Sequence, residues 1–217
     1  MISNIEDLVA FLHEFHAPWG EHRPSPDIPD NLPRALTILY AEFGNLIDMD
    51  PHDPRIPFAT QDGLMPANRL QYIDGMCEFA WENQGNWSCR FPIDGDDPPV
   101  FSNSRDVWEE GPPKGFVQAC DSLEHFLITL CLQEAVMSCP KLIACNGQDV
   151  GSIFRSPPIP LWMDGIYVDG EPSHDFYMYE GSKMLIMNCG TVWVGSHADD
   201  IEPQFANSTK FSTISDY

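Results

Sequence analysis

Two runs in the middle of the chain alternate apolar and polar residues. Apolar side chains fall at every second position of both runs, at Cys77, Phe79 and Trp81 and then at Trp87, Cys89 and Phe91. Polar or small residues stand between them, at Glu78, Ala80, Glu82, Ser88 and Arg90. Because a strand turns successive side chains to opposite faces, this period of two predicts a β-hairpin with one face in the core, turning at residues 82–87.

Two N-terminal segments carry apolar residues at helical spacing. Residues 4–16 follow a capping-box pattern formed by Ser3 and Glu6, so we expect an amphipathic helix there. A second helix is expected after Pro33, since proline suits the first helical turn. It is expected to end at Gly44, where glycine commonly provides a left-handed C-terminal cap.

A third helix follows Asp121, which forms another capping pattern with Glu124. Its apolar residues are spread widely around the helix. Only a narrow polar stripe remains, made of Ser122, His125, Thr129 and Gln133. A helix that is apolar almost all round is buried, so we expect this one to run through the core.

Shorter apolar runs make up the rest of the chain. We expect short strands around residues 63–70, a long proline-punctuated loop at 140–160, and a terminal meander at 176–179, 184–187 and 192–194. One domain over residues 1–217 is expected, with a loose tail after about residue 200. Strict strand–helix alternation is missing, so the expected class is α+β, with a mixed, mainly antiparallel sheet, N-terminal helices and one long buried central helix.

The charge of the chain narrows the choice of partners. It has 33 acidic and 11 basic residues, a formal net charge of -22. Binding a polyanion requires a basic surface, so nucleic acid is not expected as a ligand. A basic protein is the better match, although an acidic excess also serves solubility alone.

The seven cysteines are odd in number and include no Cys-x-x-Cys pair. Most stand in apolar runs, as Cys131 does, where a thiol packs as a small hydrophobic group. This usage indicates free thiols in a reducing cytosol. The N-terminus lacks the basic start and apolar core of a signal peptide, and no apolar stretch is long enough to span a bilayer. We therefore expect a soluble, cytoplasmic protein with no membrane partner.

Three short motifs superficially resemble metal sites, and none has the required pattern. The histidines of His13–His16 are three positions apart, whereas the zinc-protease motif needs four, so we expect surface polar residues near a helix end. The acidic run that starts at Asp48 has Ala59 where a calcium loop needs glutamate. The run that starts at Asp94 has Arg105 at the same position, which favours a solvated turn.

Familiar enzyme signatures are missing from the sequence. It contains no Gly-x-Ser-x-Gly elbow, no phosphate-binding glycine-rich loop and no dinucleotide fingerprint. A cysteine–histidine pair, or a pair of carboxylates that includes Glu82, remains open from the sequence alone. We expect no catalytic residue, no cofactor and no metal.

Aromatic residues are dense between Phe79 and Trp108. Trp81 and Trp87 share the expected inner face of the hairpin, so we expect both to pack in the core. Trp108 lies beside Glu109 and Glu110 in a loop, which makes it the best candidate for an exposed binding anchor.

Five ordered segments between Leu32 and Ile201 carry a family resemblance. They are Leu32–Gly44, Glu82–Trp87, Pro98–Val100, Ser122–Leu127 and Val192–Gly195. In that order they look like the leading helix, hairpin, following strand, next helix and closing strand of the SUKH superfamily, whose members are also called Smi/Knr-like. The Glu-Asn-Gln-Gly-x-Trp run is the most specific of the five. The segment 141–160 is longer than expected for the family.

The resemblance implies a SUKH-like fold and a non-enzymatic, protein-binding role. Bacterial members are commonly immunity proteins that neutralise polymorphic toxins, so we expect one that occludes a cognate toxin domain, such as a nuclease. A regulatory scaffold for an endogenous protein, like the yeast members that act in cell-wall synthesis, is the alternative, and a small-molecule hydrolase is third. The partner-binding residues that we expect are Asp94, Asp96, Asp97, Trp108, Glu109 and Glu110. The sequence leaves the oligomeric state open.

Overall fold

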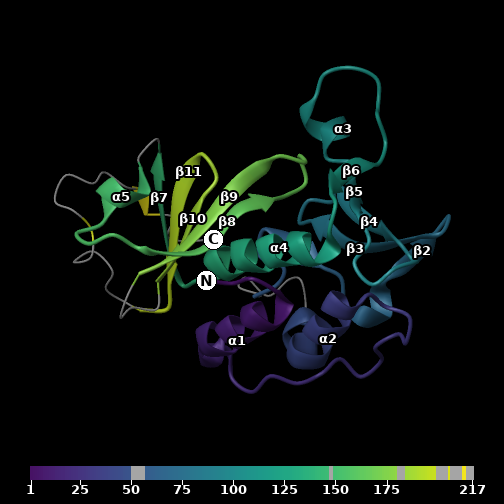
Figure 1. The fold of residues 1–217 in the computed structure, drawn as a ribbon, viewed down its shortest axis with the longest axis horizontal. Coiled ribbons are helices and arrows are strands. Elements are labelled where there is room, and N and C mark those ends of the chain that lie inside the picture. Colours follow the sequence, from purple (N-terminus) through teal and green to yellow (C-terminus); the bar gives the residue numbers. More distant parts are fainter. Residues whose placement is uncertain (50–56, 147–148, 180–183, 199–204, 206–211, 214–217) are drawn as a thin grey trace.

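Two antiparallel sheets lie on either side of one buried helix, α4 (Leu123–Met137), and two N-terminal helices cover that helix from below (Figure 1). The computed structural model describes residues 1–49, 57–146, 149–179, 184–198, 205 and 212–213. The α+β class is confirmed. Every described strand pair is antiparallel, and the strands form two sheets where one mixed sheet was expected.

Helix α1 (Ile5–Phe15) confirms the first predicted helix, with a cap one residue later than expected. Asn4 is the N-cap, and its side-chain oxygen accepts a hydrogen bond from the backbone N–H of Asp7 (2.9 Å). Ser3 donates its own backbone N–H to the Asp7 carboxylate (3.0 Å). Asparagine caps helices as well as serine does, so the cap pattern alone did not fix the position.

Helix α2 (Arg34–Ile47) does not end at Gly44, and the expected left-handed cap is wrong. The helix continues for three more residues and ends at Ile47, with Asp48 as its C-cap. Gly44 instead allows the preceding connector to cross the helix, where the backbone N–H of Ser25 donates to the Tyr40 carbonyl (2.9 Å). A Cβ atom at position 44 would lie 1.8 Å from the nitrogen of Ser25, so only glycine fits this crossing.

Helix α4 confirms the predicted buried helix. Ser122, not Asp121, is its N-cap and accepts the backbone N–H of His125 (3.0 Å). The polar stripe is covered by strand β8 (Ile159–Ile166), which supplies matching groups. His125 Nε2 accepts the N–H of Ile166 (3.0 Å), and Trp162 Nε1 donates to Thr129 Oγ1 (3.2 Å). His125 and Thr129 of the stripe therefore join α4 to the second sheet, whereas Gln133 donates to Asp62 in the first sheet.

The first sheet contains the predicted hairpin. Its strands are β1 (Asp62–Leu64), β2 (Gln71–Ile73), β3 (Met76–Glu82), β4 (Ser88–Pro92), β5 (Val100–Ser102) and β6 (Val117–Cys120). The order is β1-β3-β4-β5-β6, and β2 pairs with the beginning of β3. A short 3₁₀ helix, Ala67–Arg69, connects β1 to β2.

A β-bulge at Phe79 changes the side-chain alternation of β3. Glu78 pairs with Arg90 and Ala80 pairs with Cys89, so Phe79 is an extra residue in the strand. Beyond the bulge the faces exchange. Glu82 is buried, and Trp81 is half-buried on the outer side, which reverses the expectation for both residues.

The second sheet contains the predicted terminal meander and three strands that the sequence did not predict. Its strands, besides β8, are β7 (Lys141–Asn146), β9 (Pro172–Met178), β10 (Met184–Asn188), β11 (Thr191–Ser196) and β12 (Ser212–Thr213). The meander is β9 to β11, and the strands that were not predicted are β7, β8 and β12. The order is β12-β7-β11-β10-β9-β8. The segment expected as a loop at 140–160 therefore holds β7, the short helix α5 (Val150–Ile153) and the start of β8.

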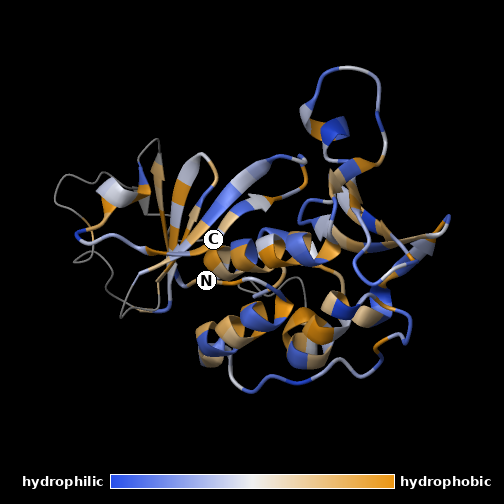
Figure 2. Cartoon of the chain, viewed as in Figure 1, coloured by the Kyte–Doolittle hydropathy of each residue, from blue (hydrophilic) through white to orange (hydrophobic). Residues whose placement is uncertain are grey.

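Hydrophobic residues gather where α1, α2 and α4 meet, and the inner faces of both sheets complete this core (Figure 2). The other face of the second sheet has its own cluster, which includes Ile153, Phe154 and Phe205. Phe205 is buried and pairs with Phe154. Of the tail after about residue 200, only Phe205 and β12 are among the described residues, and both are attached to the second sheet.

Candidate functional site

The loop between β5 and β6 projects from the body of the protein and carries Trp108 (Figure 1). Trp108 is 71% exposed and ends the single-turn helix α3 (Arg105–Trp108). Its neighbours Val107, Glu109 and Glu110 are exposed as well. The predicted exposure of Trp108 beside acidic residues is therefore confirmed.

Ion pairs and hydrogen bonds hold this loop in one shape. The carboxylate of Asp106 accepts the backbone N–H groups of Lys114 and Gly115, the latter at 3.0 Å. Glu109 forms ion pairs with Lys114 and, at 3.7 Å, with Arg105. At the base of the loop, Arg105 Nη2 donates to the Asp169 carbonyl (3.0 Å), which ties the loop to the β8–β9 turn. Trp108 is thus presented by a closed, cross-braced loop.

The predicted aspartates lie at the other end of β5. Asp94, Asp96 and Asp97 belong to the exposed turn between β4 and β5, whereas Trp108 follows β5. Asp97 has a structural role, because its Oδ1 accepts the backbone N–H of Glu124 (2.8 Å) at the start of α4. The six predicted residues therefore form two separate groups, not one surface.

A pair of buried carboxyl groups, Asp62 and Glu134, lies between β1 and α4. Glu134 is fully buried and accepts three backbone N–H groups, from Thr60 (2.6 Å), Gln61 (2.9 Å) and Asp62 (2.9 Å). Asp62 Oδ2 accepts hydrogen bonds from Gln133 Nε2 and the Tyr167 hydroxyl, each at 2.7 Å. Asp62 Oδ1 is buried and has no hydrogen-bond partner among the described residues.

Burial raises the pKa of both carboxyls well above their ordinary values, and their mutual repulsion adds to the increase for Glu134. Shifted carboxyl pKa values often mark active sites, but Asp62, Glu134 and the surrounding Gln133 and Tyr167 are all buried. Glu82, beside Asp62, is also buried, and its Oε2 accepts the N–H of Gln84 (3.0 Å) within the hairpin turn. These acids hold the fold together and are not open to a substrate.

The histidines of the first helix differ in their surroundings. His13 is partly exposed, and its Nε2 lies 2.9 Å from Glu42 Oε2. His16 is completely buried, which overturns the expectation of a surface residue. Neither of its ring nitrogens has a hydrogen-bond partner in the described part of the chain, and burial lowers its pKa to about 3. His16 is therefore a neutral side chain packed among aromatic rings such as Phe43 and Phe58.

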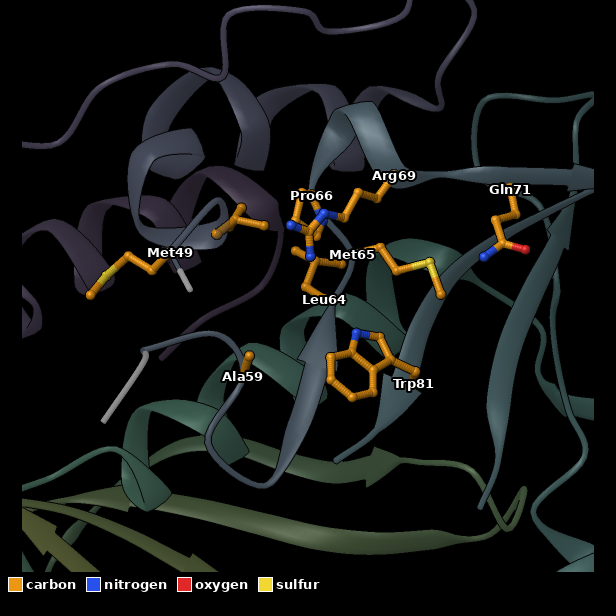
Figure 3. Close-up of a pocket in the computed structure, with 9 residues that line it drawn as sticks. Met49, Ala59, Leu64, Met65, Pro66, Arg69, Gln71 and Trp81 are labelled. Carbon is orange, nitrogen blue, oxygen red and sulfur yellow. The ribbon is translucent and has the colours of Figure 1, made fainter. Parts of the chain in front are cut away.

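A cavity of about 200 Å³ lies beside the first sheet, below the end of α2 (Figure 3). It is lined by Ile47, Met49, Ala59, Leu64, Met65, Pro66, Arg69, Gln71 and Trp81. Most of these side chains are apolar, and Arg69 is the only charged one among them. Sequence reasoning missed this site because Trp81 reaches it only through the bulge in β3.

The buried carboxyls were also missed, although one signal was available. Glu134 stands in an otherwise apolar stretch of α4, next to the polar stripe residue Gln133. A carboxylate in the interior of a buried helix requires partners, and that requirement points to a polar network. The partners themselves come from distant segments, so the sequence does not identify them.

Two further observations concern the described residues only. No group of three or more histidine, cysteine, aspartate or glutamate side chains there is arranged to hold a metal ion, and no helix there is both long and apolar enough to cross a bilayer. All seven cysteines are free.

Comparisons with protein-family models, with curated proteins and with solved structures found no match to this chain.

Proposed function

We propose that the chain is a non-enzymatic, SUKH-type binding protein, an immunity protein that covers a basic toxin domain in the cytosol. The sequence resemblance in the hairpin and the helices supports this proposal. The observation that carries it is the exposure of Trp108 on a braced, acidic loop, 71% of its surface being open to solvent.

An exposed tryptophan on a loop of fixed shape suits protein recognition. Tryptophan is enriched among the residues that dominate binding energy, because it buries a large apolar area. Ordering a loop on binding is costly, and the contacts of Asp106 and Glu109 have already ordered this one. Exposed Val107 extends the apolar contact beside Trp108. The surface therefore has an apolar centre with an acidic rim.

The net charge of -22 adds a kinetic advantage with a basic partner. A nuclease surface that binds phosphate is basic, and opposite charges accelerate encounter by about 10 to 1,000-fold at low salt. Asp94 and Asp96 lie away from Trp108, so they contribute to this long-range attraction without contacting the partner. The partner's active site would then be blocked by the loop that carries Trp108.

Co-expression with the product of the neighbouring gene tests the proposal. We expect rescue of growth from a toxic product and a stable complex. Trp108→Ala should weaken that complex by about 30-fold or more, since a central aromatic anchor contributes about 2 kcal/mol. Ile159→Ala is the matched control, because Ile159 is an exposed apolar residue on the second sheet and should leave affinity unchanged.

The competing functions give different results in the same experiment. A complex without rescue from toxicity would favour a regulatory scaffold. Formation of no complex, or an unchanged affinity for Trp108→Ala, would count against the proposal. Turnover of a small molecule by the purified protein would favour a hydrolase.

A further inference from the structure

The cavity below α2 has a rigid apolar floor. Strand β1 continues into Met65, whose N–H donates to the Phe79 carbonyl (2.7 Å) and whose carbonyl accepts the buried Tyr40 hydroxyl (2.6 Å). The N–H of Leu64 donates to the Phe58 carbonyl (3.0 Å). Because these backbone groups are fixed from both sides, the cavity exists without a ligand.

The indole of Trp81 forms one wall of the cavity and rests on the backbone of Gly63. These two residues pair across β1 and β3. A Cβ atom at position 63 would lie 2.6 Å from Trp81 Nε1, so the missing side chain lets the ring lie flat against β1. Figure 3 shows the ring nitrogen on the side that faces Leu64 and Arg69. No described residue accepts a hydrogen bond from this nitrogen.

The guanidinium of Arg69 faces Trp81 across the cavity (Figure 3). Five other basic residues, Arg23, Arg34, Arg90, Arg105 and Lys114, form ion pairs with carboxylates. Arg69 has no carboxylate within 4.0 Å among the described residues, in a chain with 33 acidic residues. Asp48 interacts with it only at longer range, and the Asp48 carboxylate is held by the Ser25 hydroxyl (3.2 Å).

We infer that this cavity is a binding site for a small apolar carboxylate. The anionic end pairs with the Arg69 guanidinium, which binds carboxylates through two parallel hydrogen bonds. The hydrocarbon or aromatic end lies against Trp81, Leu64 and Met65. A carboxylate near Arg69 also accepts a hydrogen bond from Trp81 Nε1, which supplies a third donor.

The size of the cavity limits the ligand. A volume of about 200 Å³ equals the share of about seven water molecules in the liquid. This is smaller than the roughly 300 to 1,000 Å³ of sites for drug-sized ligands, which favours a small acid over a nucleotide. A free carboxylic acid with one aromatic or branched end does fit, and so does the terminal residue of a peptide with a free carboxylate.

Titration with 3-phenylpropionate, followed by amide and indole N–H signals in NMR spectra, tests the inference. We expect binding with a Kd on the order of 1 mM and shifts at Met65 and at the Trp81 indole, which Trp81→Phe assigns. The uncharged analogue 3-phenylpropanamide should bind at least about 10-fold more weakly, because it cannot form the charged pair with Arg69. A short peptide ending in leucine with a free C-terminus then distinguishes a peptide ligand from a free acid.

Arg69→Gln should weaken binding of 3-phenylpropionate by about 10-fold or more without unfolding the protein, because Arg69 is exposed. Arg23→Gln is the matched control, since it removes an exposed guanidinium paired with Glu21 and should leave binding unchanged. Equal binding of the acid and the amide, unchanged affinity for Arg69→Gln, or no shift at Trp81 up to the solubility limit would overturn the inference. None of these results bears on Trp108, so the proposed function is tested separately.

Discussion

Glu134 Oε1 accepts the backbone N–H of Asp62 at 2.9 Å, which brings two buried carboxyl groups together. No described cation pairs with either of them. Two unpaired negative charges in the same buried site repel each other, so one of the two groups keeps a proton at neutral pH. Glu134 accepts three N–H groups that have no alternative acceptor, and Asp62 has a buried oxygen without a donor. We predict that the proton is on Asp62, because the three backbone partners of Glu134 can only donate hydrogen bonds.

The stability of the fold should fall as the pH rises, because of this pair. Burial raises the folded-state pKa, so the folded protein binds protons more tightly than the unfolded chain. This contribution is present at low pH and is lost from about pH 4 upward, through the raised pKa values. Asparagine at position 62 does not titrate, so the Asp62→Asn variant avoids this loss. Between pH 5 and pH 8 its free energy of unfolding should exceed that of the parent protein by about 1 to 3 kcal/mol.

Urea unfolding at several pH values measures this difference. Asp94→Asn, at an exposed position, is the control and should differ from the parent protein by the same amount at every pH. A pH-independent difference for Asp62→Asn would mean that Asp62 does not carry the proton.

Glu134→Gln should behave in the opposite way to Asp62→Asn. Asparagine at position 62 keeps an oxygen for Gln133 and Tyr167 and places an amide where Asp62 carries its proton. Glutamine at position 134 turns an N–H toward one of three backbone N–H donors. The backbone N–H would then be left unpaired in the interior, and the new side-chain N–H would face it. We expect the Glu134→Gln substitution to lower the free energy of unfolding at pH 5 by about 2 to 4 kcal/mol for this reason. Denaturation curves for the two variants at pH 5 decide the point, and equal stabilities would contradict the assignment of the proton.

His16→Leu should stabilise the protein, most strongly in mild acid. Burial lowers the pKa of His16 to about 3. In mild acid the unfolded chain therefore binds a proton at His16 that the folded protein does not bind. The stability loss begins as the pH falls below about 6.5 and reaches about 2 kcal/mol at pH 5. Leucine avoids this loss and fills the aromatic surroundings with an apolar group. Thermal unfolding at pH 5 and pH 7.5 should show a larger gain at pH 5, and equal gains would indicate that His16 is protonated when folded.

Gly44→Ala should be among the most damaging small substitutions in the protein. The added Cβ would lie 1.8 Å from the Ser25 nitrogen and 2.5 Å from the Pro24 carbonyl carbon, so backbone has to move. We expect a loss of about 3 kcal/mol or more in the free energy of unfolding. Gly151→Ala is the control, because Gly151 is exposed in α5 and the nearest atom to its added Cβ would be the end of the Asp149 side chain, at 3.2 Å. Similar stabilities of the two variants would contradict this account of Gly44.

The helices were predictable because their signals are local. The apolar spacing of α1 and the nearly continuous apolar surface of α4 each determine an element without reference to the rest of the chain. Exposure of Trp108 was predictable for a similar reason, since the adjacent Glu109 and Glu110 in a loop favour a position at the surface. The errors at the N-caps of α1 and α4 were one residue each, because adjacent residues could both serve as caps.

Features that depend on contacts between distant segments were not predictable. Gly44 carries the sequence signature of a cap, but its role comes from a connector nearly 20 residues earlier in the chain. Strand β8 was not predicted, because its hydrogen bonds with His125 and Thr129 of α4 join segments more than 30 residues apart. The partners of Glu134 lie more than 70 residues away from it.

The extra residue at Phe79 has two effects on β3, the burial of a carboxyl group and the formation of one wall of the cavity. It turns Glu82 inward toward the buried acids and turns Trp81 outward over Gly63. Deleting one residue at this point would send the tryptophan inside and return the glutamate to water, so the protein would gain packing and lose the cavity that Arg69 and Trp81 line. Selection for higher stability would therefore favour loss of the extra residue, whereas selection for the cavity would keep it.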